Sequence, residues 1–223
     1  KADRKIIEKL LANKTLLREE KLTHSYPHCW RCKRPVIFRA TEQWFISMEK
    51  NDLRRRALES IDRVAWIPPW GRERIRGMLE SRPDWCISRQ RSWGVPIPVF
   101  YCKKCHQPLL SEELCDHIGS IFMREGSDAW FIRSANNLLP SHVRCSGCGG
   151  SDFSKEEDIL DVWFDSGVSH AALVEVHPQL GGIADLYLEG SDQHRGWFHT
   201  ALLTSVATRG RAPYQSVLTH GFT

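Results

Sequence analysis

The chain has 223 residues, of which 41% are hydrophobic and 26% are charged, and its formal net charge is +4. A chain of this length and composition can bury a substantial core, in one or two compact units. No stretch is apolar over the length needed to cross a bilayer, and no signal peptide is visible. We therefore expect a cytoplasmic protein with no membrane partner, and a monomer.

The first predicted element is a helix over residues 1–21, interpreted as a connector over residues 1–25. Its apolar side chains recur at helical spacing and share one face. They are Ile6, Ile7, Leu10 and Leu11.

A C-x2-C pair, Cys29 and Cys32, follows the connector. One such pair supplies only two of the four ligands that a tetrahedral zinc site needs. The single cysteines Cys86 and Cys115 offer no matching pair. We therefore expect this half-site to be without a metal or loosely metallated.

Residues 26–100 are rich in arginine, with tryptophans interleaved. Such side chains can bind phosphates and stack on unpaired RNA bases, but an arginine-rich helix is more commonly a solvated face. Both interpretations stay open for this region. The arginines are Arg54, Arg55, Arg56, Arg72, Arg74, Arg76, Arg82, Arg89 and Arg91, and the tryptophans are Trp66, Trp70, Trp85 and Trp93.

Two further C-x2-C pairs predict a metal centre within residues 101–150. The pairs are Cys102 with Cys105 and Cys145 with Cys148. Four thiolates from two turns can form the closed shell of a structural zinc, and the alternative is four free cysteines. We predict a zinc-ribbon insertion here, with a helix over residues 111–124 that begins at Ser111.

The last part of the chain predicts strand, helix and strand. Residues 184–188 alternate as a buried strand does, residues 197–207 have helical spacing, and residues 216–218 form a second apolar run. A parallel crossover of this kind places residues 189–194 and 219–221 at one edge, beyond the carboxyl ends of the strands. Open α/β sheets bind ligands at that edge.

The residue types at this edge suit an adenosine and a charged small molecule. Asp192 can accept from ribose hydroxyls, Gln193 can both donate and accept, and Glu189 can hold an ammonium group. Gly190 lets a ligand approach the backbone. The alternative interpretation is that Asp192 and Gln193 only cap the following helix.

Six runs of residues resemble the isoleucyl-tRNA synthetases, which are class I aminoacyl-tRNA synthetases. The resemblance covers nearly the whole chain, and valyl and leucyl relatives share the general layout. The runs are SYPHCWRC (25–32), WFI (44–46), DWCISRQR (84–91), DVWFDSG (161–167), YLEGSDQHRGWF (187–198) and LTHGF (218–222).

The resemblance implies an α/β fold, the second half of a Rossmann-type catalytic domain with a doubly wound parallel sheet. Residues 26–100 would be a catalytic-domain segment and residues 151–223 the second Rossmann half, with the zinc ribbon inserted between them. The HIGH-type and KMSKS-type motifs are absent from this sequence, as is most of the editing domain, which the connector would follow. We expect an excised middle part that is inactive alone.

The resemblance also implies residue roles. Glu189, Gly190, Asp192, Gln193, His220 and Gly221 would bind the aminoacyl-adenylate. Trp163 and Trp197 would form walls around the isoleucine side chain, although core packing is the commoner role of each tryptophan taken singly.

The intact enzyme would use ATP and Mg²⁺ to form isoleucyl-adenylate and would transfer isoleucine to tRNA(Ile). Asp161 and Asp165 are possible magnesium ligands, with turn or cap roles as the alternative. Two other functions remain open: a zinc-ribbon RNA-binding module without catalysis, and a valyl-type class I synthetase.

Overall fold

A computed structural model describes residues 2–222, and its contacts divide the chain into two units, residues 1–42 and 43–223. Residues 1 and 223, the outer ends of the predicted connector and of the predicted second Rossmann half, lie outside the described residues. The α-helices are α1 (Ala2–Ala12), α2 (Leu53–Ile61), α3 (Trp70–Glu80), α4 (Glu112–Glu125), α5 (Ala129–Ile132), α6 (Ala135–Leu138), α7 (Val162–Gly167) and α8 (Trp197–Arg209). The strands are β1 (Phe45–Ile46), β2 (Ala65–Ile67), β3 (Trp85–Cys86), β4 (Ser88–Arg89), β5 (Phe100–Cys102), β6 (Pro108–Leu109), β7 (Phe153–Lys155), β8 (Ile159–Leu160), β9 (Ala184–Gly190) and β10 (Tyr214–His220). Short 3-10 or π turns are η1 (Lys50–Asp52), η2 (His170–Val174), η3 (Pro178–Leu180) and η4 (Ser191–His194).

The first unit contains α1 and a small knuckle. The helix predicted over residues 1–21 ends at Ala12, so the prediction was too long. Lys14 adopts a left-handed φ of 57°, and the N–H of Thr15 donates to the Leu10 carbonyl at 3.0 Å. This arrangement closes the last turn as a left-handed cap does.

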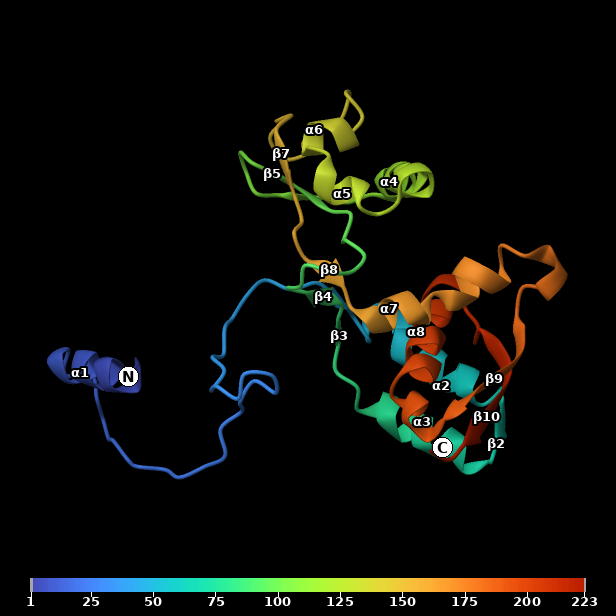
Figure 1. Cartoon of the computed structure of the whole chain (residues 1–223), viewed down its shortest axis with the longest axis horizontal. Helices are drawn as coiled ribbons and strands as arrows, with labels where there is room; N and C mark the ends of the chain where they lie inside the picture. The colour runs from blue at the N-terminus through green and yellow to red at the C-terminus, as the bar shows by residue number, and fades with distance from the viewer. Residues whose placement is uncertain (1, 223) are drawn as a thin grey trace. The chain divides into compact units, whose positions relative to one another are not determined.

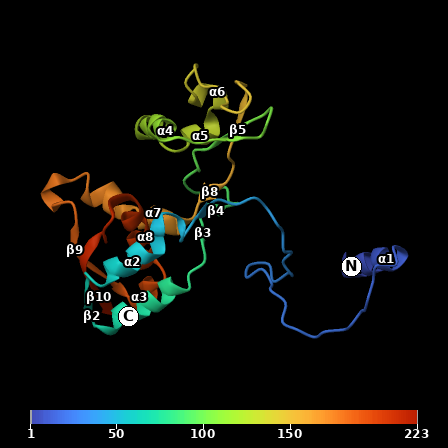
Figure 2. The same cartoon turned by 180° about the vertical axis from the view of Figure 1, so that it is seen from behind.

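A parallel sheet of three strands forms the body of the second unit, in the order β2-β10-β9 (Figure 1). The predicted strand, helix and parallel strand are confirmed as β9, α8 and β10. Helices α2, α3 and α8 gather on one side of this sheet in both views (Figure 2). Their apolar side chains share one core with Trp66, Tyr187 and Val217 of the three strands.

The opposite face of the sheet differs from the doubly wound arrangement that we predicted. Leu188, expected to lie in a buried strand, is 52% exposed, and Leu186 and Ile67 beside it are also exposed. Parallel strands are ordinarily covered on both faces. Within the described residues of the second unit, 43–222, helices cover only one face.

The insertion has its own sheet and its own core. Strands β6-β5-β7 are antiparallel, and the core includes Phe100, Ile118 and Trp130. The predicted helix at residues 111–124 is confirmed as α4. The Ser111 hydroxyl caps it by accepting from the Leu114 N–H at 3.2 Å.

None of the helices in residues 2–222 is both long and apolar enough to cross a membrane.

Candidate functional site

The carboxyl ends of β9 and β10 bring two distant segments together, as the sequence predicts. Glu189 pairs in register with Thr219, and Gly190 pairs with His220. The His220 Nε2 atom lies 3.9 Å from Glu189 Oε2, and both side chains are accessible to solvent. We call this region, with Asp192, Gln193 and Gly221, the strand-end site.

Gly190 lies where the strand-end site has no room for a side chain. A Cβ at this position would lie 2.9 Å from Asp192 Oδ1 and 3.8 Å from His220 Cε1. The first distance is shorter than a normal contact, so any other residue would displace the carboxylate. Glycine at this position therefore lets the Asp192 carboxylate and the His220 ring lie close to the backbone of β9.

Asp192 and Gln193 connect the strand-end site to the start of α8. The Trp197 N–H donates to Gln193 Oε1 at 3.0 Å, and Gln193 Nε2 donates to Asp192 Oδ2 at 2.9 Å. Gln193 thus caps α8, as one of the two sequence interpretations proposed. The cap also fixes the orientation of the Asp192 carboxylate.

Trp163 and Trp197, from α7 and α8, both lie beside Gly196. A Cβ on Gly196 would approach the Trp163 ring to 2.7 Å. The Trp197 ring stacks on Tyr187 with 4.0 Å between centroids, and its Nε1 donates to Ser169 Oγ at 3.0 Å. Trp163 is 42% exposed, so one indole is anchored and the other borders open space.

Close packing between α7 and α8 holds Trp163 in place. A Cβ on Gly167 would meet the backbone of Thr200 at 3.1 Å. The Thr204 hydroxyl donates to the Gly167 carbonyl at 2.7 Å. The two helices therefore approach at backbone distance.

Asp161 is a buried carboxylate whose partners could not be read from the sequence. Its Oδ2 accepts from Trp85 Nε1 at 3.0 Å and from the Arg89 guanidinium at 3.0 Å. Its Oδ1 accepts from the Trp163 N–H at 3.3 Å and so caps α7. A cap role was the alternative to magnesium binding. Burial, with the nearby Asp161 charge, raises the pKa of Asp165.

Two histidines behind the strand-end site are buried. Burial lowers the pKa of His194, whose Nδ1 lies 3.0 Å from the Ser191 carbonyl. Burial and the nearby Arg82 charge lower the pKa of His199 to about 3. Both rings are therefore neutral near pH 7. Sequence analysis assigned them no role, because only their place in the core distinguishes them.

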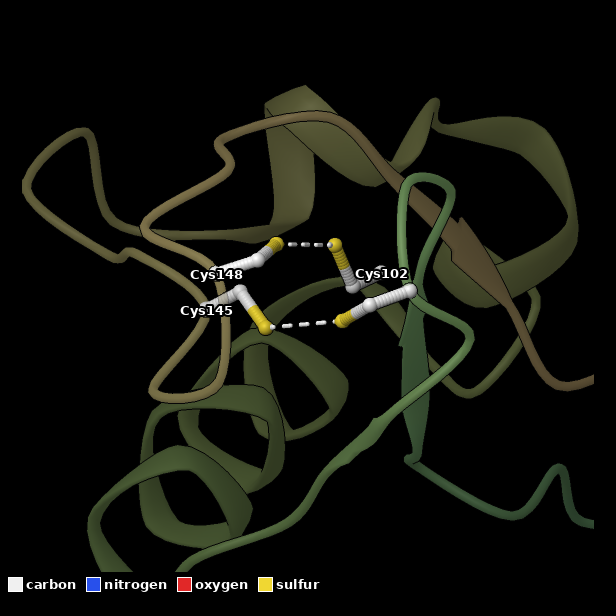
Figure 3. Close-up of side chains that lie close together, drawn as sticks. Cys102, Cys145 and Cys148 are labelled. Atoms are coloured by element: carbon white, nitrogen blue, oxygen red, sulfur yellow. Dashed lines mark hydrogen bonds between the residues drawn. The ribbon is translucent and has the colours of Figure 1, made fainter.

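The four cysteines of the insertion converge as predicted (Figure 3). Cys102 Sγ lies 3.5 Å from Cys148 Sγ, Cys105 Sγ lies 3.5 Å from Cys145 Sγ, and all four sulfurs lie within 4.8 Å of one another. Tetrahedral zinc with bonds of about 2.3 Å needs sulfurs about 3.8 Å apart. The donor set therefore suits zinc without rearrangement of the backbone.

Hydrogen bonds prepare one thiol of the cluster for metal binding. The Cys105 N–H lowers the pKa of Cys102 to about 7. The Gln107 N–H acts in the same direction on Cys105, but the neighbouring thiols, Cys145 first, outweigh it and raise the pKa of Cys105 to about 12. Zinc binds thiolates, so its binding would release protons. Cys115, on α4, is not part of the cluster.

The Cys29 and Cys32 pair has the same backbone geometry as the two pairs of the insertion. In each pair the first cysteine's carbonyl accepts, at 2.8 Å, from the N–H four residues later. The donor residue also has a left-handed φ, between 57° and 71°. These residues are Lys33, His106 and Gly149. Cys29 and Cys32 thus form a knuckle with metal-binding geometry but only two ligands.

Comparison with known proteins identifies the family of this chain. Residues 5–223 match the family of class I tRNA synthetases (I, L, M and V), so the chain belongs to that family. It is 62% identical to the isoleucine–tRNA ligase of Geobacter sulfurreducens, over 99% of this chain and 24% of that protein. It is 59% identical to the enzyme of the same name from Caldanaerobacter subterraneus, over 99% of this chain and 23% of that protein. The chain therefore spans about a quarter of the length of these relatives.

Among solved structures, a ternary LeuRS-tRNA-LeuAMS complex from Agrobacterium radiobacter K84 matches with a TM-score of 0.40 and 19% identity. The match covers 63% of this chain and 20% of that chain. A score this low supports no conclusion.

Proposed function

We propose that the chain is the central part of an isoleucine–tRNA ligase and supplies part of its aminoacyl-adenylate pocket. The observation that carries this proposal is the register of β9 and β10, which sets Glu189 and Gly190 beside His220. The relatives that match nearly the whole chain bear the name isoleucine–tRNA ligase. The fold would be the second half of a Rossmann-type domain.

The first reaction would join isoleucine to AMP. A carboxylate oxygen of isoleucine attacks the α-phosphorus of ATP, and pyrophosphate leaves with the electrons of the broken P–O bond. No protein nucleophile is needed, so the site acts by orientation and charge. Glu189 would hold the ammonium group, Asp192 the ribose hydroxyls, and His220 with Gly221 the adenosine.

The isoleucine side chain would lie between the indoles of Trp163 and Trp197. Trp197 is fixed by its stack on Tyr187 and its hydrogen bond to Ser169. Gln193, fixed by its cap of α8, would face the amino-acid end of the ligand. Rigid flat walls lose little entropy when a branched aliphatic group binds.

The insertion would hold a structural zinc ion through Cys102, Cys105, Cys145 and Cys148. When bound, zinc would tie β5 to the loop before β7 and stabilise a unit with a small core. The Cys29 and Cys32 knuckle stays a predicted half-site.

The intact protein would use ATP and Mg²⁺, transfer isoleucine to tRNA(Ile) and act in the cytoplasm. The second step needs a ribose hydroxyl of the tRNA to attack the adenylate carbonyl, with AMP as the leaving group. The two signature motifs absent from this sequence would handle the phosphates. We therefore expect the chain alone to be inactive.

Calorimetry with non-hydrolysable isoleucyl-, valyl- and leucyl-adenylate analogues tests the proposal. We expect the isoleucyl analogue to bind most tightly. Asp192→Ala should weaken the binding of all three analogues, because it removes the contact to the ribose that they share. Asp185→Ala, at the amino end of β9, is the matched control and should bind as the parent does. Tighter binding of the valyl analogue would favour a valyl-type enzyme. Binding of none would contradict the proposal and favour the RNA-binding module.

A further inference from the structure

The segment between α1 and β1 has an unusual charge pattern. Residues 22–41 contain no aspartate or glutamate, and their four cationic side chains are all exposed. None of the four forms an ion pair with a described residue of its own unit, residues 2–42. They are Arg31, Lys33, Arg34 and Arg39. An uncompensated basic surface attracts polyanions.

A short hairpin holds this basic segment in shape. The Cys29 N–H donates to the Arg34 carbonyl at 2.8 Å, and the Val36 N–H donates to the Pro27 carbonyl at 3.1 Å. The Tyr26 hydroxyl donates to the Val36 carbonyl at 2.8 Å. The knuckle is therefore an ordered turn whose two flanking segments are joined by hydrogen bonds.

Trp30 lies in the turn of the knuckle and is 74% exposed. The Arg31 guanidinium lies over its ring, 4.8 Å from the centroid. Phe38 is also exposed, and its ring contacts Tyr26 edge to face. An exposed indole beside unpaired cations is the combination on which unpaired bases stack while phosphates are neutralised.

The arginine-rich helices are a weaker candidate for the same role. Arg55 forms ion pairs with Asp52 and Glu59, and Arg72 and Arg76 share Asp62. These guanidinium groups already have carboxylate partners, so binding RNA would require those ion pairs to break. The knuckle would incur no such cost.

We propose that the knuckle surface, defined by Tyr26, Trp30, Arg31, Arg34 and Phe38, binds unpaired RNA nucleotides. A base stacks on the accessible face of Trp30, and Arg31 and Arg34 contact the adjoining phosphates. The choice of RNA rests on the proposed function, which has tRNA as a substrate. The surface itself is separate in sequence from the strand-end site.

Fluorescence anisotropy with a short, labelled single-stranded RNA tests this proposal on the whole chain. We expect Trp30→Ala to weaken binding roughly tenfold, because loss of one base–aromatic stack has effects of this order. Trp30→Tyr should retain most of the affinity. Arg34→Gln should reduce the slope of log K against log salt by about 0.7, the value for one phosphate contact on a single strand.

Two matched variants control for general effects of the substitutions. Trp93→Ala removes another tryptophan, 92% exposed, and Arg55→Gln removes an ion-paired arginine. Both should change the affinity less than twofold. Equal weakening by Trp93→Ala, or no RNA binding by the parent chain, would overturn the proposal. Adenylate-analogue binding is measured separately on the Trp30→Ala chain. It distinguishes failure of the RNA-binding proposal from failure of the strand-end site.

Discussion

Removal of the Asp161 carboxylate should destabilise the second unit, and the effect can be estimated from its contacts. Asp161→Ala removes the cap of α7, which costs about 1 kcal/mol in comparable helices. It also leaves the buried Trp85 N–H without its acceptor, at a cost of about 1–3 kcal/mol. Arg89 is 39% exposed, so water can replace its bond. We expect a total loss of about 2–4 kcal/mol.

Urea unfolding followed by tryptophan fluorescence measures this loss. Asp165→Ala is the matched control, because it makes the same change on the same helix at a carboxylate with a raised pKa. Ionised Asp165 is disfavoured by burial and by Asp161, so its removal should be neutral or slightly stabilising. Equal midpoints for the two variants at an unchanged slope would refute the role assigned to Asp161.

Three further predictions concern the start of α8, the metal centre and pH. Gly196→Ala should weaken adenylate-analogue binding, because its Cβ would meet Gln193 Oε1 at 2.6 Å and the Trp163 ring at 2.7 Å. Gly77→Ala is the control: its Cβ would meet nothing within 4 Å, so it should stabilise α3 by about 0.5–1 kcal/mol. Chelation or Cys102→Ser should abolish hydrogen-exchange protection in α4 and leave the protection of β10 unchanged. Cys115→Ser should leave the protection of α4 unchanged. Persistent protection of α4 after chelation would contradict the zinc assignment. The pKa of His199 is lowered to about 3, so the folded state binds fewer protons than the unfolded state. The contribution of the neutral His199 ring to the free energy of unfolding is therefore fully present above the unfolded pKa of about 6.5. It falls as pH decreases, by up to about 1.4 kcal/mol per pH unit for one histidine. Unfolding midpoints at pH 7 and pH 5 should show a smaller decrease for His199→Gln, and an unchanged decrease would count against the buried neutral ring.

The elements predicted correctly are those in which local pattern and chain geometry act together. A strand, a helix and a parallel strand place both carboxyl ends at one edge, which is why Glu189 and His220 could be predicted to lie close together. The spacing of Cys102, Cys105, Cys145 and Cys148 likewise predicted their convergence. In both cases the sequence pattern itself limits the possible geometries.

The elements predicted poorly depend on contacts that no local pattern encodes. Asp161 accepts from Trp85, which is 76 residues away in the sequence, and nothing near either residue indicates the other. The first helix ends at Ala12 in a turn closed by the left-handed Lys14, and the spacing of its apolar residues does not indicate that end. Leu188 has the pattern of a buried strand, yet within residues 43–222 no layer covers it.

The most direct test of the strand-end site is an NMR titration of the ¹⁵N-labelled chain with the isoleucyl-adenylate analogue. We predict that the amide signals of Gly190, Gln193 and Gly221 and the indole signal of Trp197 shift together and saturate at one ligand per chain. Signals from α4 should stay unchanged. Shifts confined to the insertion, or none at the ends of β9 and β10, would contradict the assignment of the adenylate pocket to this edge of the sheet.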